Sequence, residues 1–226
     1  MSDLASRLDQ FINRRVLCIG DLMIDNYVYG RVERISPEAP IPVLHQQSGK
    51  TTLGGAGNVV WNIATLGGTV AVIGVVGQDE AANTMAKQFK LSPGVTAHLV
   101  TDSSRPTTQK IRFVADRQQL LRVDDENAKP ISANIEKQII QMAANMLATV
   151  QVVILSDYAK GVLTPKITAE TIRLSREADK IVIVDPKGRD FGRYRGATYL
   201  TPNRKELSDA LGKPITTVTE AYIDNR

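Results

Sequence analysis

The sequence predicts an α/β protein built on a mainly parallel sheet that helices cover on both faces. Short apolar runs at residues 16–19, 70–76, 152–155 and 181–184 alternate with segments of helical periodicity. Such runs are typical of strands buried on both faces. Their alternation with helices indicates right-handed βαβ units. We therefore expect one layered domain over residues 1–226.

The first half of the chain starts with a predicted amphipathic helix over residues 3–13, where Leu4, Leu8, Phe11 and Ile12 share one side. The apolar run at 16–19 then predicts a buried strand. The next predicted elements are short strands at 27–30 and 41–45, a helix over 59–66, a strand at 70–76, a helix over 79–90 and a strand at 98–100. Prolines beside the strand at 41–45 favour a sheet edge or an excursion outside the main sheet.

The second half gives clearer signals. Residues 107–114 and 118–123 flank a polar turn and predict a hairpin. Ile135, Ile139, Met142 and Met146 have helical spacing and predict the longest helix, over 132–149. The remaining predicted elements are strands at 152–155, 181–184 and 198–200 and helices over 165–178 and 204–211. Residues 27–45 and 107–123 do not fit the βαβ alternation, so we expect them to form a small β lid.

Composition excludes several classes of protein. The formal net charge of +4, with 23% charged and 42% hydrophobic residues, is ordinary for a globular protein. The mild positive charge suits an anionic small molecule, and the chain has no Lys/Arg tract of the nucleic-acid-binding type. A single cysteine excludes an internal disulfide and a thiolate metal cluster. No apolar run approaches 18 residues and the start carries no signal or transit pattern, so we expect no membrane span and a cytoplasmic protein.

A glycine-rich segment at residues 53–58 (LGGAGN) precedes the helix predicted over 59–66. Gly54, Gly55 and Gly57 allow a tight turn and close backbone approach to a ligand, and Asn58 is the expected N-cap. A helix start offers free N–H groups to an oxygen-rich ligand. The alternative is a turn that only packs the helix. Neither the dinucleotide-binding fingerprint nor the P-loop is present, because each lacks a required glycine.

Polar residues follow four of the predicted parallel strands. Gly20 and Asp21 follow the first, and residues 156–161 (SDYAKG), 185–188 (DPKG) and 201–206 (TPNRKE) follow the others. The carboxyl ends of parallel strands share one edge of the sheet, and ligands bind in the crevice there. The sequence therefore predicts a cleft lined by carboxylates and lysines.

Taken together, these motifs resemble the PfkB, or ribokinase-like, carbohydrate kinases. The glycine-rich segment is similar to the family's sugar-binding signature, and Asn203-x-x-Glu206 resembles its magnesium-associated motif. Longer motifs resemble one subfamily, the D-glycero-β-D-manno-heptose 7-phosphate kinases. These motifs are residues 21–25 (DLMID), 27–30 (YVYG), 34–43 (RISPEAPIPV), 118–122 (QQLLR), 156–161 (SDYAKG), 185–188 (DPKG) and 193–198 (RYRGAT).

The resemblance implies a three-layer αβα kinase that transfers phosphate from ATP, with Mg²⁺, to the anomeric hydroxyl of heptose 7-phosphate in lipopolysaccharide core synthesis. It implies homodimers formed through the lid. The residues it assigns to the sugar are Asp21, Asp25, Gly54, Gly55 and Asn58. Candidates for the substrate's own phosphate are Lys110, Arg112 and Lys160, for which a solvated charge is the alternative. Lys187, Asn203 and Glu206 are assigned to ATP, and Glu206 to the Mg²⁺ shell through water. For Lys187, too, a solvated charge is the alternative.

One departure from the family concerns catalysis. Its members carry a Gly-x-Gly-Asp motif whose Asp accepts the proton of the attacking hydroxyl, and no such motif follows Glu206. We therefore expect an N-terminal portion of the kinase that lacks the C-terminal third of the fold, holds no catalytic base and turns over poorly. The alternatives are a PfkB kinase for another sugar or sugar phosphate, and a non-catalytic module that binds sugar phosphate or dimerises.

Overall fold

The computed structural model describes residues 5–216 of the chain. The strands are β1 (Arg15–Gly20), β2 (Leu22–Ile35), β3 (Pro42–Gly55), β4 (Thr69–Val76), β5 (Val95–Thr101), β6 (Gln109–Ala115), β7 (Gln118–Asp125), β8 (Val152–Ser156), β9 (Ile181–Asp185) and β10 (Tyr199–Leu200). The helices are α1 (Ala56–Thr65), α2 (Glu80–Lys90), α3 (Ala133–Met146), α4 (Pro165–Glu177) and α5 (Arg204–Leu211), with 3-10 turns η1 (Ala5–Phe11), η2 (Leu147–Thr149) and η3 (Phe191–Tyr194).

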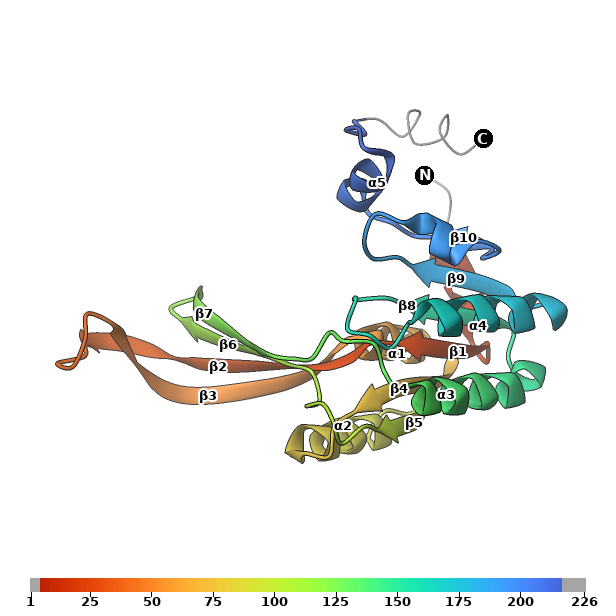
Figure 1. The fold of residues 1–226 in the computed structure, drawn as a ribbon. Coiled ribbons are helices and arrows are strands. Elements are labelled where there is room, and N and C mark those ends of the chain that lie inside the picture. The colour runs from red at the N-terminus through yellow and green to blue at the C-terminus, as the bar shows by residue number, and fades with distance from the viewer. Residues whose placement is uncertain (1–4, 217–226) are drawn as a thin grey trace.

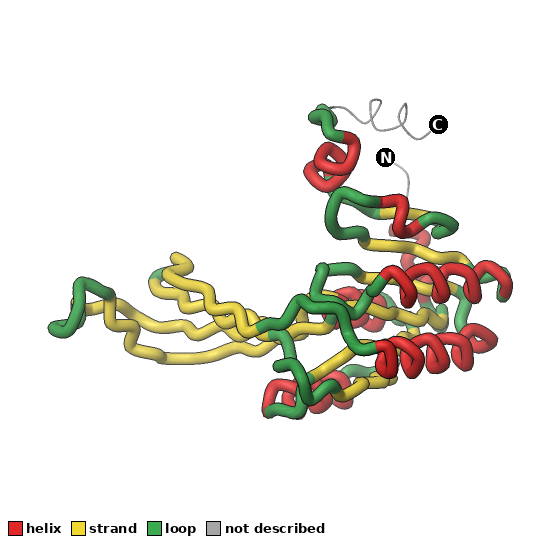
Figure 2. The backbone as a smooth tube through the Cα atoms, viewed as in Figure 1, coloured by secondary structure: helices red, strands yellow, loops and turns green. Residues whose placement is uncertain are grey.

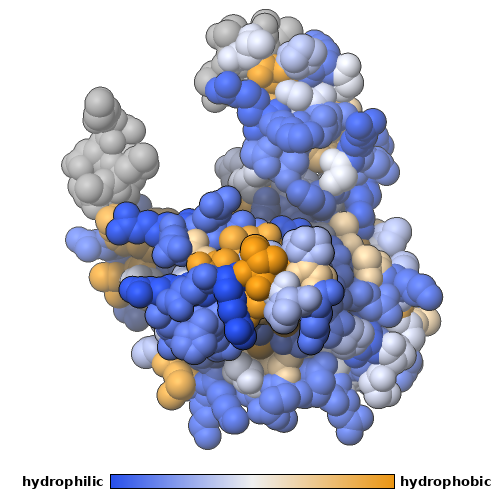
Figure 3. Space-filling model, turned by 90° about the vertical axis from the view of Figure 1, so that its left-hand side faces the viewer, coloured by the Kyte–Doolittle hydropathy of each residue, from blue (hydrophilic) through white to orange (hydrophobic). Residues whose placement is uncertain are grey.

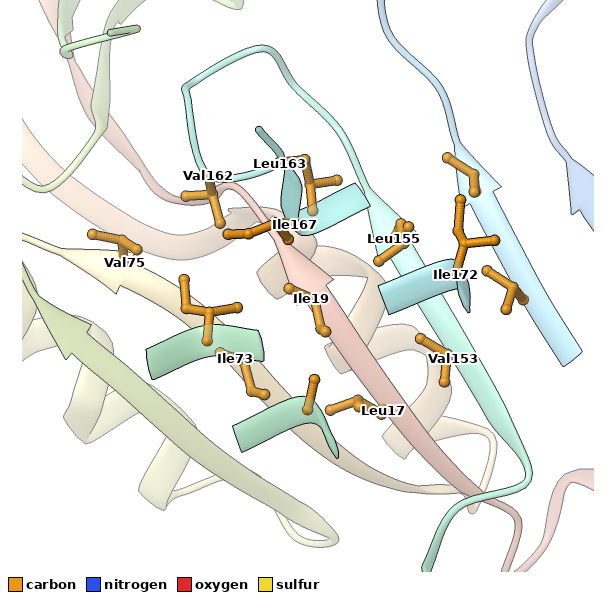
Figure 4. Close-up of a cluster of buried hydrophobic side chains, with 14 of the residues drawn as sticks. Leu17, Ile19, Ile73, Val75, Val153, Leu155, Val162, Leu163, Ile167 and Ile172 are labelled. Carbon is orange, nitrogen blue, oxygen red and sulfur yellow. The ribbon is translucent and has the colours of Figure 1, made fainter. Parts of the chain in front are cut away.

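The main sheet has six parallel strands in the order β10-β9-β8-β1-β4-β5 (Figure 1). Its two faces are covered by different helices, as the alternation along β1 shows. Leu17 and Ile19 pack with α3 and α4 in one buried cluster (Figure 4). Val16 and Cys18 pack with α1 and α2 in another. The predicted α/β architecture with helices on both faces is confirmed.

A second sheet of order β3-β2-β6-β7 forms the lid, which projects away from the main sheet (Figure 2). The lid prediction is correct in kind but too small, because β2 and β3 are each 14 residues long. Most of their side chains are exposed or half-buried. Strands that are not buried need no continuous apolar face. Much of the length of β2 and β3 therefore shows no hydrophobic pattern from which a strand could be predicted. Pro42 begins β3, an edge strand, as the prolines predicted.

Two predicted local structures differ. The first element is a 3-10 turn rather than an amphipathic helix, and Leu8, Phe11 and Ile12 are exposed; Leu4 lies outside the described residues. Helix α1 begins three residues earlier than predicted, with Gly55 as its N-cap. Asn58 is therefore inside the first turn of α1 and does not cap it. The reason is the φ of +57° at Gly55, which turns the chain directly from β3 into the helix.

Candidate functional site

Four loops meet where β1, β8, β9 and β10 end. These strands are neighbours in the parallel sheet, so the loops that follow them lie along one edge. Backbone hydrogen bonds join these ends directly, since Asp21 N donates to Ser156 O at 3.2 Å and Asp157 N donates to Asp185 O at 3.0 Å. The four polar segments that the sequence placed at strand ends therefore lie at one rim.

Asp21 organises this rim rather than facing outward. Its side chain is buried, with 1% of the residue exposed. The carboxylate accepts three backbone N–H bonds, from Tyr158 at 2.8 Å, Lys160 at 3.1 Å and Val162 at 3.1 Å. Burial raises the pKa of Asp21, and the three N–H donors oppose that shift. The Asp21 carboxylate is thus occupied by backbone N–H groups, and its contact with a sugar hydroxyl stays a prediction.

Asp25 is the carboxylate that the glycine-rich segment accommodates. It lies on β2, where residues pair with β3, and Gly54 makes room for it. A Cβ at position 54 would lie 2.2 Å from Asp25 Oδ2. At Gly55 a Cβ would lie 2.4 Å from the backbone oxygen of Asp21. The close approach of these neighbouring oxygens therefore requires glycine at both positions. At position 54 the neighbour is Asp25, a residue predicted to bind the sugar.

Arg112 holds Asp25 in place. On β6, Arg112 lies directly opposite Tyr27 of β2, and its Nη1 donates to Asp25 Oδ1. The guanidinium also stacks over the Tyr27 ring at 5.2 Å. Burial would lower the pKa of Arg112, but the hydrogen bond and charge of Asp25 outweigh it and raise that pKa. Arg112 therefore orients the Asp25 carboxylate in this structure, a partnership the sequence did not reveal.

The two lysines predicted to bind the substrate's phosphate share one carboxylate. Glu126 follows β7; its Oε1 accepts from Lys160 Nζ at 2.6 Å and its Oε2 from Lys110 Nζ at 3.4 Å. Lys110 also donates to Asp124 at 2.9 Å. The hydrogen bond from Lys160 lowers the pKa of Glu126, and that from Lys110 lowers the pKa of Asp124. The two ammonium groups are thus brought together, and a bound anion has to compete with carboxylates for them.

The predicted ATP residues form a second group at the other end of the rim. Asn203 and Glu206 make a capping box at the start of α5, in which Asn203 Oδ1 accepts from Glu206 N at 2.9 Å and Glu206 Oε2 accepts from Asn203 N at 3.0 Å. The other carboxylate oxygen of Glu206 accepts from Lys187 Nζ at 3.1 Å. Asp185 is close by, and its pKa is raised by burial and then by the charge of Glu206.

Tyr158 lies in the segment after β8, and its backbone N–H donates to Asp21 Oδ2 at 2.8 Å. Its pKa is raised first by burial and then by the charges of Asp185, Glu206 and Asp25. Asn58 is exposed in the first turn of α1, and its side chain makes no hydrogen bond to another described residue.

Three hollows of the described chain lie away from the predicted site residues, and the cleft at the rim stays a prediction. A hollow of about 720 Å³ lies beside α4 and η3, one of about 410 Å³ at the start of α2, and one of about 350 Å³ between α2 and β5. The predicted site residues line none of them. Among residues 5–216 the structure also forms no group of three or more His, Cys, Asp or Glu side chains that could hold a metal ion.

Several residues that support the rim were missed. Asp124 and Glu126 come two and four residues after the QQLLR motif, so that motif's neighbourhood was the available signal. Arg105 braces the Lys160 loop by donating to Lys160 O at 3.2 Å and Lys129 O at 2.9 Å. Nothing in the spacing of Arg105 marks this role, because the two carbonyl groups that it braces are 24 and 55 residues away.

Comparison with known proteins decides the family. Residues 13–223 match the pfkB family of carbohydrate kinases. The chain belongs to this family. No helix in the described part is long and apolar enough to cross a membrane.

Curated relatives of this pfkB-family chain include proteins named "Bifunctional protein HldE". The chain is 50% identical over 206 residues to the one from Bradyrhizobium sp. (strain ORS 278), covering 90% of this chain and 42% of the relative. It is 47% identical over 212 residues to the one from Rhodopseudomonas palustris (strain BisB18), covering 93% and 43%. The chain thus spans less than half the length of these relatives.

Solved structures show the same ribokinase-like fold at low sequence identity. Phosphofructokinase-2 from Escherichia coli, in its tetrameric inhibited form, aligns with a TM-score of 0.71 at 16% identity, over 94% of this chain and 68% of that one. Ribokinase from Arabidopsis thaliana, in complex with ribose and ATP, aligns with a TM-score of 0.65 at 19% identity, over 94% and 67%. About a third of each of these chains has no counterpart here.

Proposed function

We propose that this chain carries the sugar site and part of the ATP site of a kinase that phosphorylates the anomeric hydroxyl of D-glycero-β-D-manno-heptose 7-phosphate. The observation that carries the proposal is the rim itself. Asp25 is fitted against Gly54 and held by Arg112, and the Lys187–Glu206 pair lies beyond the ends of β9 and β10. Identity of about half to proteins named HldE supports the choice of substrate. We place the reaction in the cytoplasm.

At the sugar end, Asp25 accepts hydrogen bonds from sugar hydroxyls, and Arg112 fixes the orientation of its carboxylate. Gly54 and Gly55 allow the sugar to approach the backbone, and Asn58 adds an amide from the first turn of α1. Asp21 acts indirectly, by holding the backbone of residues 158–162. Lys110 and Lys160 bind the 7-phosphate, with Glu126 keeping their ammonium groups close together.

At the nucleotide end, Lys187 contacts the phosphates of ATP, and Asn203 and Glu206 lie beside them. Mg²⁺ neutralises phosphate charge when it is bound. The donor chemistry fits a water-mediated role for Glu206, since each of its oxygens already accepts one hydrogen bond and retains a second lone pair. Direct ligation would instead compete with Lys187.

We further propose that this chain alone turns over very little. Phosphoryl transfer needs the nucleophile to be positioned and the developing charge to be stabilised. The Gly-x-Gly-Asp motif that would supply the base is absent from the 226 residues. We therefore propose that none of these 226 residues acts as the catalytic base.

The lid supports a second part of the proposal, a homodimer. The lid carries exposed apolar side chains, namely Ile35 and Ile41 near the β2–β3 tip and Leu120, Leu121 and Val123 on β7. Figure 3, which looks at the molecule from the lid end, shows apolar residues gathered near the centre of this face. β3 and β7 are the open edges of the lid sheet, so a second copy can pair with either.

The proposal is tested by calorimetric titration of the 226-residue chain with heptose 7-phosphate and with MgATP, alongside a coupled ADP-release assay. We expect both ligands to bind and ADP to form far more slowly than with a protein that contains the Gly-x-Gly-Asp motif. Turnover at the full rate would contradict the missing base. Preference for another sugar would favour a different PfkB kinase, and binding without turnover in a longer protein would favour a non-catalytic module.

A further inference from the structure

A buried tyrosine joins two of the loops at the rim. Tyr194 lies on η3 with 2% of its surface exposed. Its hydroxyl donates to Asp157 Oδ2 at 2.7 Å and accepts from Lys187 N at 3.2 Å. One hydroxyl thus links the segment after β8 to the segment after β9. The RYRGAT motif that contains Tyr194 has no part in the proposed function so far.

Asp157 extends this link on the side of β8. It is 3% exposed, its Oδ1 accepts from Ala159 N at 2.7 Å, and its own N–H donates to Asp185 O at 3.0 Å. The backbone of Ala159 has a φ of +55°, a conformation that non-glycine residues adopt only when neighbouring groups hold it. Asp157 therefore fixes the turn that carries Tyr158 and Lys160.

The position of the tyrosine ring does not depend on its hydroxyl. The guanidinium of Arg193 stacks over the ring at 5.3 Å and donates to Leu163 O. Phe191 packs beside it with ring centroids 6.4 Å apart. A phenylalanine at position 194 would keep these contacts and remove the two hydrogen bonds of the hydroxyl, while the bond from Asp157 N to Asp185 O still joins the two loops.

The geometry points to Tyr194 as a positioning residue for the nucleotide end of the site: its hydroxyl fixes the backbone of Lys187 against Asp157, so that the Lys187 ammonium meets Glu206. Lys187 Nζ and Glu206 Oε1 are 3.1 Å apart although the Lys187 side chain is half exposed, so the backbone has to place it. The role of Tyr194 at the nucleotide end rests on the proposed function, which assigns Lys187 to ATP. Its role in holding the two loops together does not depend on that assignment.

The test compares Tyr194→Phe with Tyr199→Phe, whose side chain is exposed on β10. Hydrogen–deuterium exchange of the unliganded chain is followed in peptides covering residues 157–161 and 185–190. MgATP and heptose 7-phosphate affinities are then measured by calorimetry. We expect Tyr194→Phe to speed exchange in both segments and to weaken MgATP binding by about tenfold, as loss of a buried hydrogen bond to a charged group implies. Heptose 7-phosphate affinity should change less than about twofold, and Tyr199→Phe should change nothing.

Unchanged exchange in Tyr194→Phe would overturn the loop-holding role. Faster exchange with unchanged MgATP affinity would overturn the role at the nucleotide end. Absence of MgATP binding to the unaltered chain would instead refute the assignment of Lys187 to ATP and the role of Tyr194 in nucleotide binding. Hydrogen–deuterium exchange would still decide whether Tyr194 holds the two loops. If Tyr194→Phe does not fold, Asp157→Asn replaces it. That variant keeps the shape and removes the charge that the hydroxyl binds, so exchange at 185–190 should again rise.

Discussion

Replacing Gly54 with alanine should weaken sugar binding by one to two orders of magnitude without unfolding the protein. The new Cβ would lie 2.2 Å from Asp25 Oδ2 and 2.9 Å from Met23 Cγ, whereas ordinary contacts begin at 3.4 Å. The Asp25 carboxylate must therefore retreat by about 1 Å, beyond the tolerance of a hydrogen bond. Its bonds to Arg112 and to a sugar hydroxyl are then lost or distorted. A hydrogen bond to a charged group contributes about 1.5–3 kcal/mol, so we expect sugar affinity to fall by about 10- to 100-fold.

The cost in stability should be smaller. Overpacking at a site where a flexible side chain can move costs about 1–3 kcal/mol, and alanine returns about 0.4–1 kcal/mol by restricting the unfolded chain. Gly49→Ala is a matched control on the same strand, because a Cβ there would meet its nearest atom, Tyr27 O, at an ordinary 3.5 Å. Calorimetry with heptose 7-phosphate and urea unfolding measure the two effects.

A double-mutant cycle isolates the cause. In an Asp25→Ala background the oxygen that the new Cβ meets is gone, so Gly54→Ala should cost little further affinity. If Gly54→Ala binds sugar phosphate within about twofold of the parent while Asp25→Ala does not, displacement of Asp25 by the new Cβ is refuted. Additive losses of binding free energy from the two substitutions would refute it equally.

Three further predictions concern the buried polar groups. Asp21→Asn offers one acceptor oxygen to three N–H donors, so it should lower the free energy of unfolding by about 1–3 kcal/mol; urea titration beside Asp116→Asn, in the exposed β6–β7 turn, checks this, and equal stability would contradict it. Because the pKa of Glu126 is depressed below its ordinary 4.5, its stabilisation is present above that pH and lost as pH falls through the folded-state value. The melting temperature should therefore fall less steeply from pH 7 to pH 3 in Glu126→Gln than in the parent. Identical slopes would argue against the pairing of Glu126 with Lys110 and Lys160. Burial raises the pKa of Cys18 to about 12, so a thiol reagent at pH 8 should label this single cysteine only on unfolding, and prompt labelling would show that β1 is not buried as described.

The core of the fold could be predicted because its strands are buried on both faces. In β1, β4, β8 and β9 this burial appears in the sequence as short continuous apolar runs, and each run matched a strand. The helices predicted over 79–90 and 132–149 correspond to α2 and α3, and the structure shows Asp79 and Ser132 as their N-caps. The length of the lid strands could not be read in this way, since all of β7 is exposed and long parts of β2 and β3 are.

The candidate site was predictable in its location but not in its pairings. Motifs at the strand ends placed Asp21, Lys160, Lys187 and Glu206 at one rim, which the strand order confirms. The partnership of Asp25 with Arg112 depends on the register of β2 against β6, across 87 residues of sequence. That register is set by packing in three dimensions, and no local spacing encodes it. For the same reason the sequence could not show that Asp21 faces inward.

We propose that this rim binds one sugar phosphate through both its hydroxyls and its phosphate. The most direct measurement is the ratio of the affinities of the chain for heptose 7-phosphate and for the same heptose without phosphate. We expect the phosphorylated sugar to bind at least about tenfold more tightly, and the ratio to collapse in Lys110→Met combined with Lys160→Met. Equal affinity for the two sugars, or a ratio that survives loss of both lysines, would contradict the account.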